Sequence, residues 1–469
     1  MPNAAAVTAG NPFLEGNFGP IMEEHDIQDM EVRGSIPKDL EGNFLRIGPN
    51  PVHIFSVETY HTFDGDGMIH SIEFSAGTAR YRNRFVQTEG FKLEQETGDW
   101  VWKGMLSMLD PTPARVPEGM PGTKNLANTA FVFHNKTLYA LHEPSQPTVI
   151  GLPNLDTRGT SDFDGKLTHS FTAHPKVDPH TGEMMTFGSS FEAPYVNYSV
   201  ISATGELVHT TPINIPKPIF MHDFAVTENH SLFLDFPITL DIERAMAGGP
   251  ALGFDAEHGS RIGVLPRFGN DADVRWFEVE VGVVIHTANA WEEGRVIVLQ
   301  AARSKTTNII GAGEALGDDP TETQGQLYQW RIDLDSGEVE EGLLCDVHCD
   351  FTRINEKYSC RKNRYVYGAI FHPTRPLTFN GVVKYDNDTG AKVTYEYGAN
   401  RFGGEAVFAP RVNSQSEDDG YIISFIHDET AEQSECLIID ALDLAAGPVA
   451  TLMIPHRVPY GFHAGWVAA

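Results

Sequence analysis

Four histidines constrain the fold of this chain more than any other feature. His174, His222, His286 and His463 lie in short stretches of apolar and strand-forming residues: SFTAHPKVDP, FMHDFAV, VGVVIHTANAW and VPYGFHAGWV. A histidine in such a stretch needs a partner, and four of them indicate one metal ion held by neutral imidazoles. The separations of 48 (174 to 222), 64 (222 to 286) and 177 residues (286 to 463) exclude a local finger. Only a closed fold that brings distant strands to one axis would let the four side chains meet.

Most of the chain has the composition of β-strands. Runs rich in Val, Ile, Phe, Tyr and Leu predict strands, and the clearest cover residues 137–143, 184–191, 231–240, 295–302 and 420–428. A recurring pair, a short polar residue followed by glycine, predicts the tips of hairpins, because the polar side chain bonds its own turn and glycine adopts φ > 0. The pairs are Thr97-Gly98, Thr181-Gly182, Thr204-Gly205, Ser336-Gly337 and Thr389-Gly390.

These signals predict an all-β fold, and the histidine spacing favours a β-propeller over a sandwich or a barrel. A separation of about 50–65 residues corresponds to one four-stranded blade with its loops. His463 lies six residues before the last residue, Ala469, as expected if the final strand closes the ring. No linker or block of charge divides the chain, so residues 1–469 are expected to form a single domain.

Helical signals are weak and local, at residues 240–248 and around 101–109. Residues 103–128 contain many Pro, Gly and Met residues and predict a long loop, of a length that is often functional. Residues 245–254 (AMAGGPALGF) are expected to form a buried helix or, alternatively, a tunnel mouth that dips into lipid.

The charge balance excludes some partners. The formal net charge is −30, from 64 acidic and 34 basic residues, which opposes binding to nucleic acid or to an anionic membrane surface. Membrane contact is expected to be peripheral at most, because no apolar run approaches the roughly 20 residues of a membrane span. No signal peptide is recognised, four cysteines are few for a disulfide scaffold, and a cytoplasmic protein is expected. No protein partner is evident.

Two other groups of potential ligands are weaker. Cys345, His348, Cys349 and Cys360 have poor spacing for zinc. The FDGDGM motif at 63–68 predicts a tight turn, since a calcium loop needs more oxygen ligands and a distal Glu. Further histidines are expected to be structural, among them His61, His70, His134, His372 and His427.

Four neutral imidazoles leave the charge of a metal ion uncompensated, whether the ion is iron, copper, zinc or nickel. Carboxylates that accept the second ring N–H of each histidine would fix its tautomer and supply negative charge. Candidates in strand-like or glycine-rich contexts are Glu143 in LHEPSQP, Asp350 in CDFTRIN and Glu405 in GGEAVFAP.

Long motifs along nearly the whole chain resemble the carotenoid cleavage oxygenases. They are EGNFGPI (15–21), LEGNFLRIGPNP (40–51), YHTFDGDGMIH (60–70), TAHPKVDPHTGE (172–183), MHDFAVTENH (221–230), RIGVLPR (261–267), FGGEAVFAPR (402–411) and PYGFHAGWV (459–467). The resemblance implies a seven-bladed β-propeller with a dome of loops and short helices over one face. It also implies one Fe(II) per chain on the propeller axis, bound by the four histidines. Such an enzyme uses O2 to split a C=C bond of a conjugated apolar substrate into two carbonyl products.

The resemblance also assigns roles around the iron. Glu143 is expected to orient His222, Asp350 to orient His286 and Glu405 to orient His463, while His174 lacks a carboxylate. The family usually has Glu where Asp350 stands, so the shorter side chain is expected to shift its histidine or to recruit a water. Thr129 matches a small residue beside an open coordination position, where its methyl group would narrow access.

The substrate remains open at this point. Family members cleave carotenoids, apocarotenoids, stilbenes or phenylpropenes, and one branch isomerises retinyl esters. A carotenoid or apocarotenoid is the first expectation, and a stilbene or phenylpropanoid alkene is the alternative. Stilbene-cleaving members place a Lys before the first carboxylate and a Tyr in the preceding loop; here His142 occupies the first position, and no Tyr lies between Tyr81 and Tyr139. His142 could itself donate to a phenol. A non-catalytic binding scaffold and an isomerohydrolase are remoter alternatives.

Overall fold

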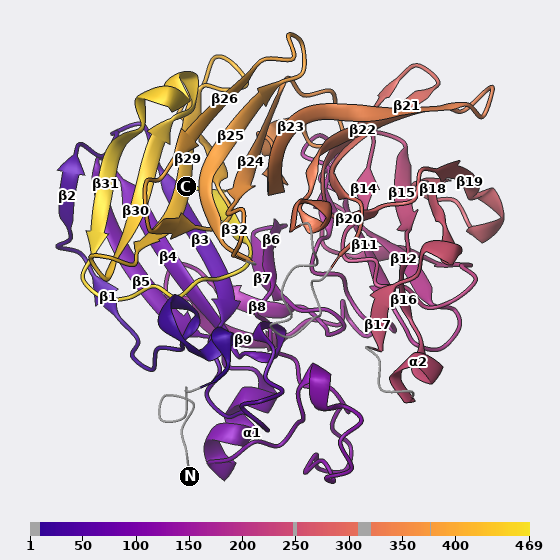
Figure 1. Cartoon of the computed structure of the whole chain (residues 1–469), viewed down its shortest axis with the longest axis horizontal. Helices are drawn as coiled ribbons and strands as arrows, with labels where there is room; N and C mark the ends of the chain where they lie inside the picture. The colour runs from indigo at the N-terminus through magenta and orange to yellow at the C-terminus, as the bar shows by residue number, and fades with distance from the viewer. Residues whose placement is uncertain (1–9, 247–250, 308–319, 376) are drawn as a thin grey trace.

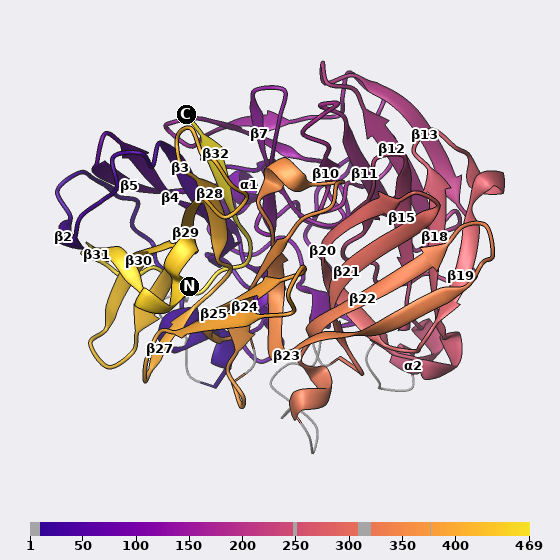
Figure 2. The ribbon, with the colours of Figure 1, turned by 90° about the horizontal axis from the view of Figure 1, so that it is seen from above.

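The computed structural model describes residues 10–246, 251–307, 320–375 and 377–469. Antiparallel strands dominate these residues, and the sheets lie around a common centre (Figures 1 and 2). No helix among them is long and apolar enough to cross a membrane.

Four blades are separate sheets. The first contains β1 (Asp26–Ile27), β5 (Thr78–Phe85), β4 (Gly67–Ser75), β3 (Gly42–Pro49) and the last strand of the chain, β32 (Ala464–Ala468). The second contains β6 (Ala130–His134), β7 (Thr137–Leu141), β8 (Thr148–Gly151) and β9 (Asp156–Thr160). The third contains β10 (Lys176–Val177), β11 (Met184–Ser189), β12 (Val196–Ile201) and β13 (Leu207–Ile213). The fourth contains β14 (Ala225–Val226), β15 (His230–Asp235), β18 (Ser260–Pro266) and β19 (Arg275–Val279).

The other three blades are joined in one 13-stranded sheet. One contains β20 (Val283–Glu293), β21 (Val296–Ser304), β22 (Gln326–Asp333) and the 15-residue β23 (Val339–Arg353), which continues into the next. That next blade adds β24 (Tyr365–Phe371), β25 (Phe379–Asp386) and β26 (Lys392–Glu396). The last contains β27 (Arg401–Gly403), β28 (Val407–Pro410), β29 (Gly420–Asp428), β30 (Gln433–Asp440), β31 (Pro448–Ile454) and β2 (Glu31–Gly34). Together the blades form the β-propeller that the sequence predicts.

The ring closes through its two ends. The C-terminal strand β32 pairs antiparallel with β3, and Phe44 lies opposite Trp466. The N-terminal β2 pairs with β31 in the preceding blade, with Val32 opposite Leu452. Segments from both termini therefore lie together at the closure (Figure 2). This confirms the prediction that the final strand closes the ring.

Strand β29 shows why the blade strands are continuously apolar. Tyr421, Ile423 and Phe425 contribute to one apolar core, whereas Ile422 and Ile426 contribute to a different one. Successive side chains of a strand point to opposite faces. A blade between two neighbours is covered on both faces, so apolar residues do not alternate with polar ones.

Short elements and loops on one side of the strands form the dome. They include α1 (Glu89–Thr97), α2 (Ile242–Met246) and the hairpin of β16 (Ile238–Leu240) with β17 (Leu252–Phe254) (Figure 1). Residues 103–128 form a loop whose only helical piece is the 3-10 turn Met105–Ser107, as predicted. Of the segment 245–254, residues 247–250 lie outside the described part of the chain; the flanking residues end α2 and form β17.

The turn predictions are correct at four of the five polar–glycine pairs. Gly182, Gly205, Gly337 and Gly390 have φ between 70 and 85° and lie between paired strands. The prediction for Thr97-Gly98 is wrong, because Gly98 (φ 70°) ends helix α1 by donating its N–H to Glu94 O. A glycine in the left-handed region serves a helix C-terminus as well as a hairpin.

Candidate metal centre

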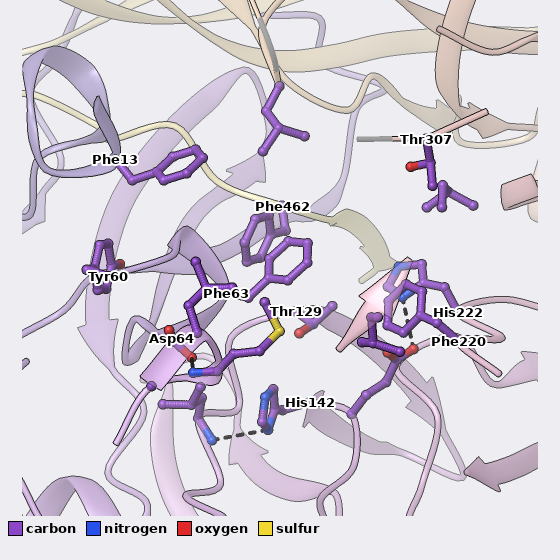
Figure 3. A pocket seen from close by; sticks show the side chains of 18 of the residues that line it. Phe13, Tyr60, Phe63, Asp64, Thr129, His142, Phe220, His222, Thr307 and Phe462 are labelled. Atoms are coloured by element: carbon purple, nitrogen blue, oxygen red, sulfur yellow. Dashed lines mark hydrogen bonds and ion pairs between the residues drawn. The ribbon is translucent and has the colours of Figure 1, made fainter. Parts of the chain in front are cut away.

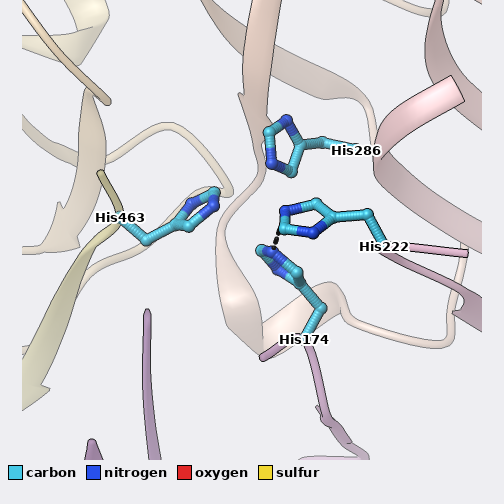
Figure 4. A group of neighbouring side chains, drawn as sticks. All are labelled: His174, His222, His286 and His463. Carbon is cyan, nitrogen blue, oxygen red and sulfur yellow. Dashed lines mark hydrogen bonds between the residues drawn. The ribbon is translucent and has the colours of Figure 1, made fainter. Parts of the chain in front are cut away.

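The four predicted histidines converge on one point at the centre of the ring. Their candidate ligand nitrogens all lie within 4.8 Å of one another, and the rings point inward from four directions (Figure 4). The closest pair is His174 Nε2 and His222 Nε2, 2.9 Å apart. His286 and His463 are 8% and 5% exposed, so the centre lies inside the protein.

Each histidine comes from a different blade, near the start of its inner strand. His286 lies within β20. His174 and His222 precede β10 and β14 by a few residues, and His463 directly precedes β32. The expectation of one histidine within each strand is therefore met only by His286.

Three carboxylates lie against the Nδ1 atoms, in the pairs that the sequence analysis expects. Glu143 Oε1 is 3.0 Å from His222 Nδ1, at ion-pair distance although not aligned as a hydrogen bond. Asp350 Oδ1 is 3.0 Å from His286 Nδ1. Glu405 Oε1 is 3.4 Å from His463 Nδ1, and Glu405 Oε2 accepts the backbone N–H of Ala464. These contacts leave the Nε2 atoms as the groups that face the centre.

Asp350 reaches its histidine directly, so no bridging water is needed for this contact. Strand β23 is irregular here: its register against β24 shifts between Asp350 and Arg353, and Phe351 has a φ of 50°. Asp350 also accepts the N–H of Phe351 at 2.8 Å, which fixes the carboxylate at the irregularity.

Burial and the carboxylates set the charge of the histidines in opposite directions. Burial holds the pKa of His174 well below its usual range, and the three neighbouring histidines lower it further. Burial lowers the pKa of His463 to about 4, although Glu405 acts against this. Burial also opposes the charging of His222, but Glu143 together with Asp223 and Asp350 outweighs burial, and the pKa of His222 is raised. Neutral imidazoles, as metal ligands must be, are therefore favoured at His174 and His463.

The donor set fits a borderline transition metal. His286 Nε2 is buried and has no hydrogen-bond partner, as expected of a nitrogen that serves as a ligand. Two nitrogens bound at about 2.0–2.1 Å to a common metal at a right angle lie roughly 2.9 Å apart, which is the separation of the His174 and His222 Nε2 atoms. Four imidazole nitrogens suit iron, copper, zinc or nickel.

A cavity of about 2560 Å³ opens onto this centre. His222, His286 and His463 line it, whereas His174 does not, so the approach is from the side of three ligands. Thr129 also lines the cavity, between His142 and His222 (Figure 3). Its carbonyl accepts the backbone N–H of His463 at 3.2 Å, so the backbone of Thr129 lies beside His463.

The FDGDGM motif forms the tight turn that was predicted. Residues Thr62–Asp64 are a 3-10 turn, and the two carboxylates point to different partners. Asp64 accepts the N–H of Met105 at 2.8 Å, and burial raises its pKa to about 6. Asp66 instead pairs with the ammonium group of Lys124. The two carboxylates therefore do not share a calcium-like site.

A buried carboxylate next to His222 in the chain was not predicted from the sequence. Asp223 follows His222 in the chain and is 3% exposed. It pairs with Lys176 at 2.7 Å and accepts two hydrogen bonds from Thr287. The signal was an acidic residue within an apolar run, MHDFAV, but its partners lie in other blades and are not evident from the sequence.

Comparisons with known proteins agree with this site. Residues 18–468 match the family model described as "RPE65: Retinal pigment epithelial membrane protein". The chain is 40% identical to the carotenoid 9,10(9',10')-cleavage dioxygenase 1 of Pisum sativum, across 97% of this chain and 90% of that protein. It is 33% identical to the isoeugenol monooxygenase of Pseudomonas putida, across 98% of this chain and 99% of that protein.

Solved structures also resemble the whole chain. The lignostilbene dioxygenase of Pseudomonas brassicacearum superposes with a TM-score of 0.88 at 29% identity, covering 98% of both chains. A cobalt-substituted form of the Synechocystis enzyme ACO has a TM-score of 0.83 and 28% sequence identity. A mutant of that enzyme, named apocarotenoid oxygenase, has a TM-score of 0.84 and 28% sequence identity. Each match covers 96% of this chain and 97% of the other chain. The end-to-end family match, the identities above 30% and the fold establish that this chain belongs to the carotenoid cleavage oxygenase family.

Proposed function

We propose that this alkene-cleaving oxygenase is a non-haem Fe(II) dioxygenase that acts on a carotenoid or apocarotenoid. The supporting observation is the cavity of about 2560 Å³ that opens onto the four histidines. Aromatic side chains line much of it, including Phe63, Phe171, Phe220, Phe351, Phe379 and Phe462. A conjugated polyene is apolar and polarisable, and such a lining would hold it without polar contacts along its length.

The size of the cavity favours a long substrate over a small one. Pockets for drug-sized ligands have volumes of about 300–1,000 Å³. The cavity here is more than twice the upper value. A phenylpropene would leave most of this volume to water, whereas an extended polyene would fill more of it. The higher identity to a carotenoid cleavage dioxygenase than to an isoeugenol monooxygenase agrees with this choice.

Iron is the metal we propose, held by His174, His222, His286 and His463. When bound there, Fe(II) supplies the electrons that allow O2 to react with the alkene. The protein contributes position and environment. The cavity walls hold one double bond near the centre and exclude water, and the carboxylates hold the imidazole rings in place. The methyl group of Thr129 narrows the approach beside His463.

A stilbene or phenylpropanoid alkene is the second candidate, because of His142. Its Nδ1 lies 3.1 Å from Ser145 Oγ and accepts the N–H of Leu126 at 3.4 Å. Burial lowers the pKa of His142 to about 3, with a further contribution from Lys124. The ring is therefore neutral and carries its proton on Nε2, where it would donate a hydrogen bond to a phenolic or carbonyl oxygen in the cavity.

A product screen tests the proposal. The purified protein, reconstituted with Fe(II) in air, is incubated with β-apocarotenals, resveratrol and isoeugenol, and the aldehyde products are identified by mass. We expect cleavage of the apocarotenal, with oxygen from 18O2 in the products. Turnover of isoeugenol or resveratrol alone would favour the second candidate. No aldehyde from any of them, with Fe(II) bound, would overturn the proposed chemistry.

A further inference from the structure

Asp223 connects three of the four metal-ligand segments through a single buried carboxylate. Its side chain is 2% exposed, and it follows His222 directly. Oδ1 lies 2.7 Å from Lys176 Nζ, and Lys176 stands two residues after His174. Oδ2 accepts both the backbone N–H and the hydroxyl of Thr287, each at 2.8 Å, and Thr287 follows His286. Three blades meet at this one group.

This arrangement differs from that of the other carboxylates. Glu143, Asp350 and Glu405 each lie against the ring of one histidine. Asp223 instead contacts Lys176 and Thr287, which are close in sequence to His174 and His286. It therefore influences the backbone positions of these histidines rather than the orientation of one ring. His174 has no carboxylate at its ring among the described ion pairs, and its segment is tied to the others through Lys176.

The contacts leave little freedom at Asp223. Oδ1 also accepts the N–H of Phe224 at 2.7 Å, so both oxygens have two donors. An asparagine would present an NH2 group to two of these donors and leave them unsatisfied in a buried place. Relief of that conflict requires the His222 segment to move relative to the β10 or β20 segment.

We propose that Asp223 is a positioning residue that sets the mutual placement of His174, His222 and His286. The inference rests on the metal centre proposed above. It predicts a defect in metal coordination as well as in stability, because ligand sites lose affinity when imidazoles are displaced by fractions of an ångström.

Cobalt binding to the metal-free full-length protein tests this inference. Co(II) is titrated into wild type and Asp223→Asn, and the Kd and the visible d–d bands are measured. We expect a loss of affinity of at least tenfold and altered bands for the variant. Asp235→Asn is the matched control, since the side chain of Asp235 is 1% exposed and its carboxylate pairs with His258 and Arg261, neither of which is adjacent in sequence to a ligand histidine. It should bind Co(II) within twofold of wild type.

Thr287→Val is the milder variant. It keeps the shape and the backbone bond to Asp223 but removes the hydroxyl donor. We expect a two- to fivefold loss of Co(II) affinity with shifted bands. Wild-type affinity and bands in folded Asp223→Asn, or equal losses in the Asp235 control, would overturn the role of Asp223. If Asp223→Asn does not fold, unchanged Co(II) affinity and bands in Thr287→Val would overturn the role of Asp223. A wild type that binds no Co(II) would instead refute the metal centre itself.

Discussion

Replacing Glu405 with Gln should weaken the metal centre more than any other single change to its carboxylates. Glu405 is 3% exposed, and its partners are the His463 ring, the N–H of Ala464 and the guanidinium of Arg353 at 3.5 Å. Burial alone would raise its pKa, but Arg353 and His463 reverse this and hold the pKa below the usual range. Glu405 is therefore ionised at neutral pH.

The expected magnitude follows from the lost charge. Changes to a carboxylate behind a ligand histidine typically cost 10- to 100-fold in metal affinity or activity, which corresponds to about 1.4–2.7 kcal/mol. We expect the upper half of this range for Glu405→Gln. Glu143→Gln should fall in the lower half, because Glu143 is 25% exposed and is not aligned as a hydrogen bond to His222.

The assay compares Fe(II) affinity, by competition with a chelator under anaerobic conditions, with kcat on the substrate found in the screen. Glu356→Gln is the control: Glu356 also pairs with Arg353, at 3.0 Å, but its side chain is 60% exposed. This control should keep wild-type values for both quantities. Equal iron affinity and kcat in Glu405→Gln and wild type would refute the reasoning that the carboxylate orients His463.

Three further predictions concern neighbouring groups. His222→Ala should abolish stoichiometric iron binding and turnover while the far-ultraviolet CD spectrum stays that of the wild type, since the blades have apolar cores; retained activity would contradict the ligand assignment. Asp350→Glu should lower kcat roughly tenfold, because the direct 3.0 Å contact with His286 has no room for another methylene, and an unchanged kcat would show that the site adapts. His142→Gln should make the free energy of unfolding less sensitive to acid. Because burial lowers the pKa of His142 to about 3 in the folded state, only the unfolded chain binds a proton at this residue as the pH falls below about 6.5. The free energy of unfolding of the wild type should therefore fall by up to about 2 kcal/mol between pH 7 and pH 5. Urea unfolding of both proteins at pH 7 and pH 5 measures the difference, and identical pH dependence would contradict a neutral His142.

The sequence is sufficient to predict the parts of this molecule that depend on local pattern or on residue type. Strand β29 occupies the predicted residues 420–428, because a strand buried on both faces is apolar throughout. The ligand histidines and the carboxylates Glu143, Asp350 and Glu405 are unusual in such surroundings, and this made them visible. The resemblance to a known family then supplied their pairing.

Features that depend on tertiary contacts were not predictable. Helix α1 has only nine residues and is amphipathic mainly through Phe91, so its sequence does not differ clearly from that of a loop. The cap from Thr88 and the left-handed Gly98 are compatible with either a helix or a turn. Asp223 is an acidic residue like many others in a chain with 64 of them, and its contacts with Lys176 and Thr287 arise only when three blades assemble.

Closure of the ring and completion of the metal centre are the same structural event. His463 donates its backbone N–H to Thr129 and accepts the N–H of Ile47 at 3.0 Å, so it is held between the second blade and β3 of the first. The next residue, Ala464, begins β32, which pairs with β3. An open ring would leave His463 away from the other three ligands. A metal that binds only the closed ring must stabilise closure, by about 2.7 kcal/mol at a free concentration of 100 times its Kd. Because His463 directly precedes the closing strand, a bound metal would link this last segment to the blades that carry His174, His222 and His286.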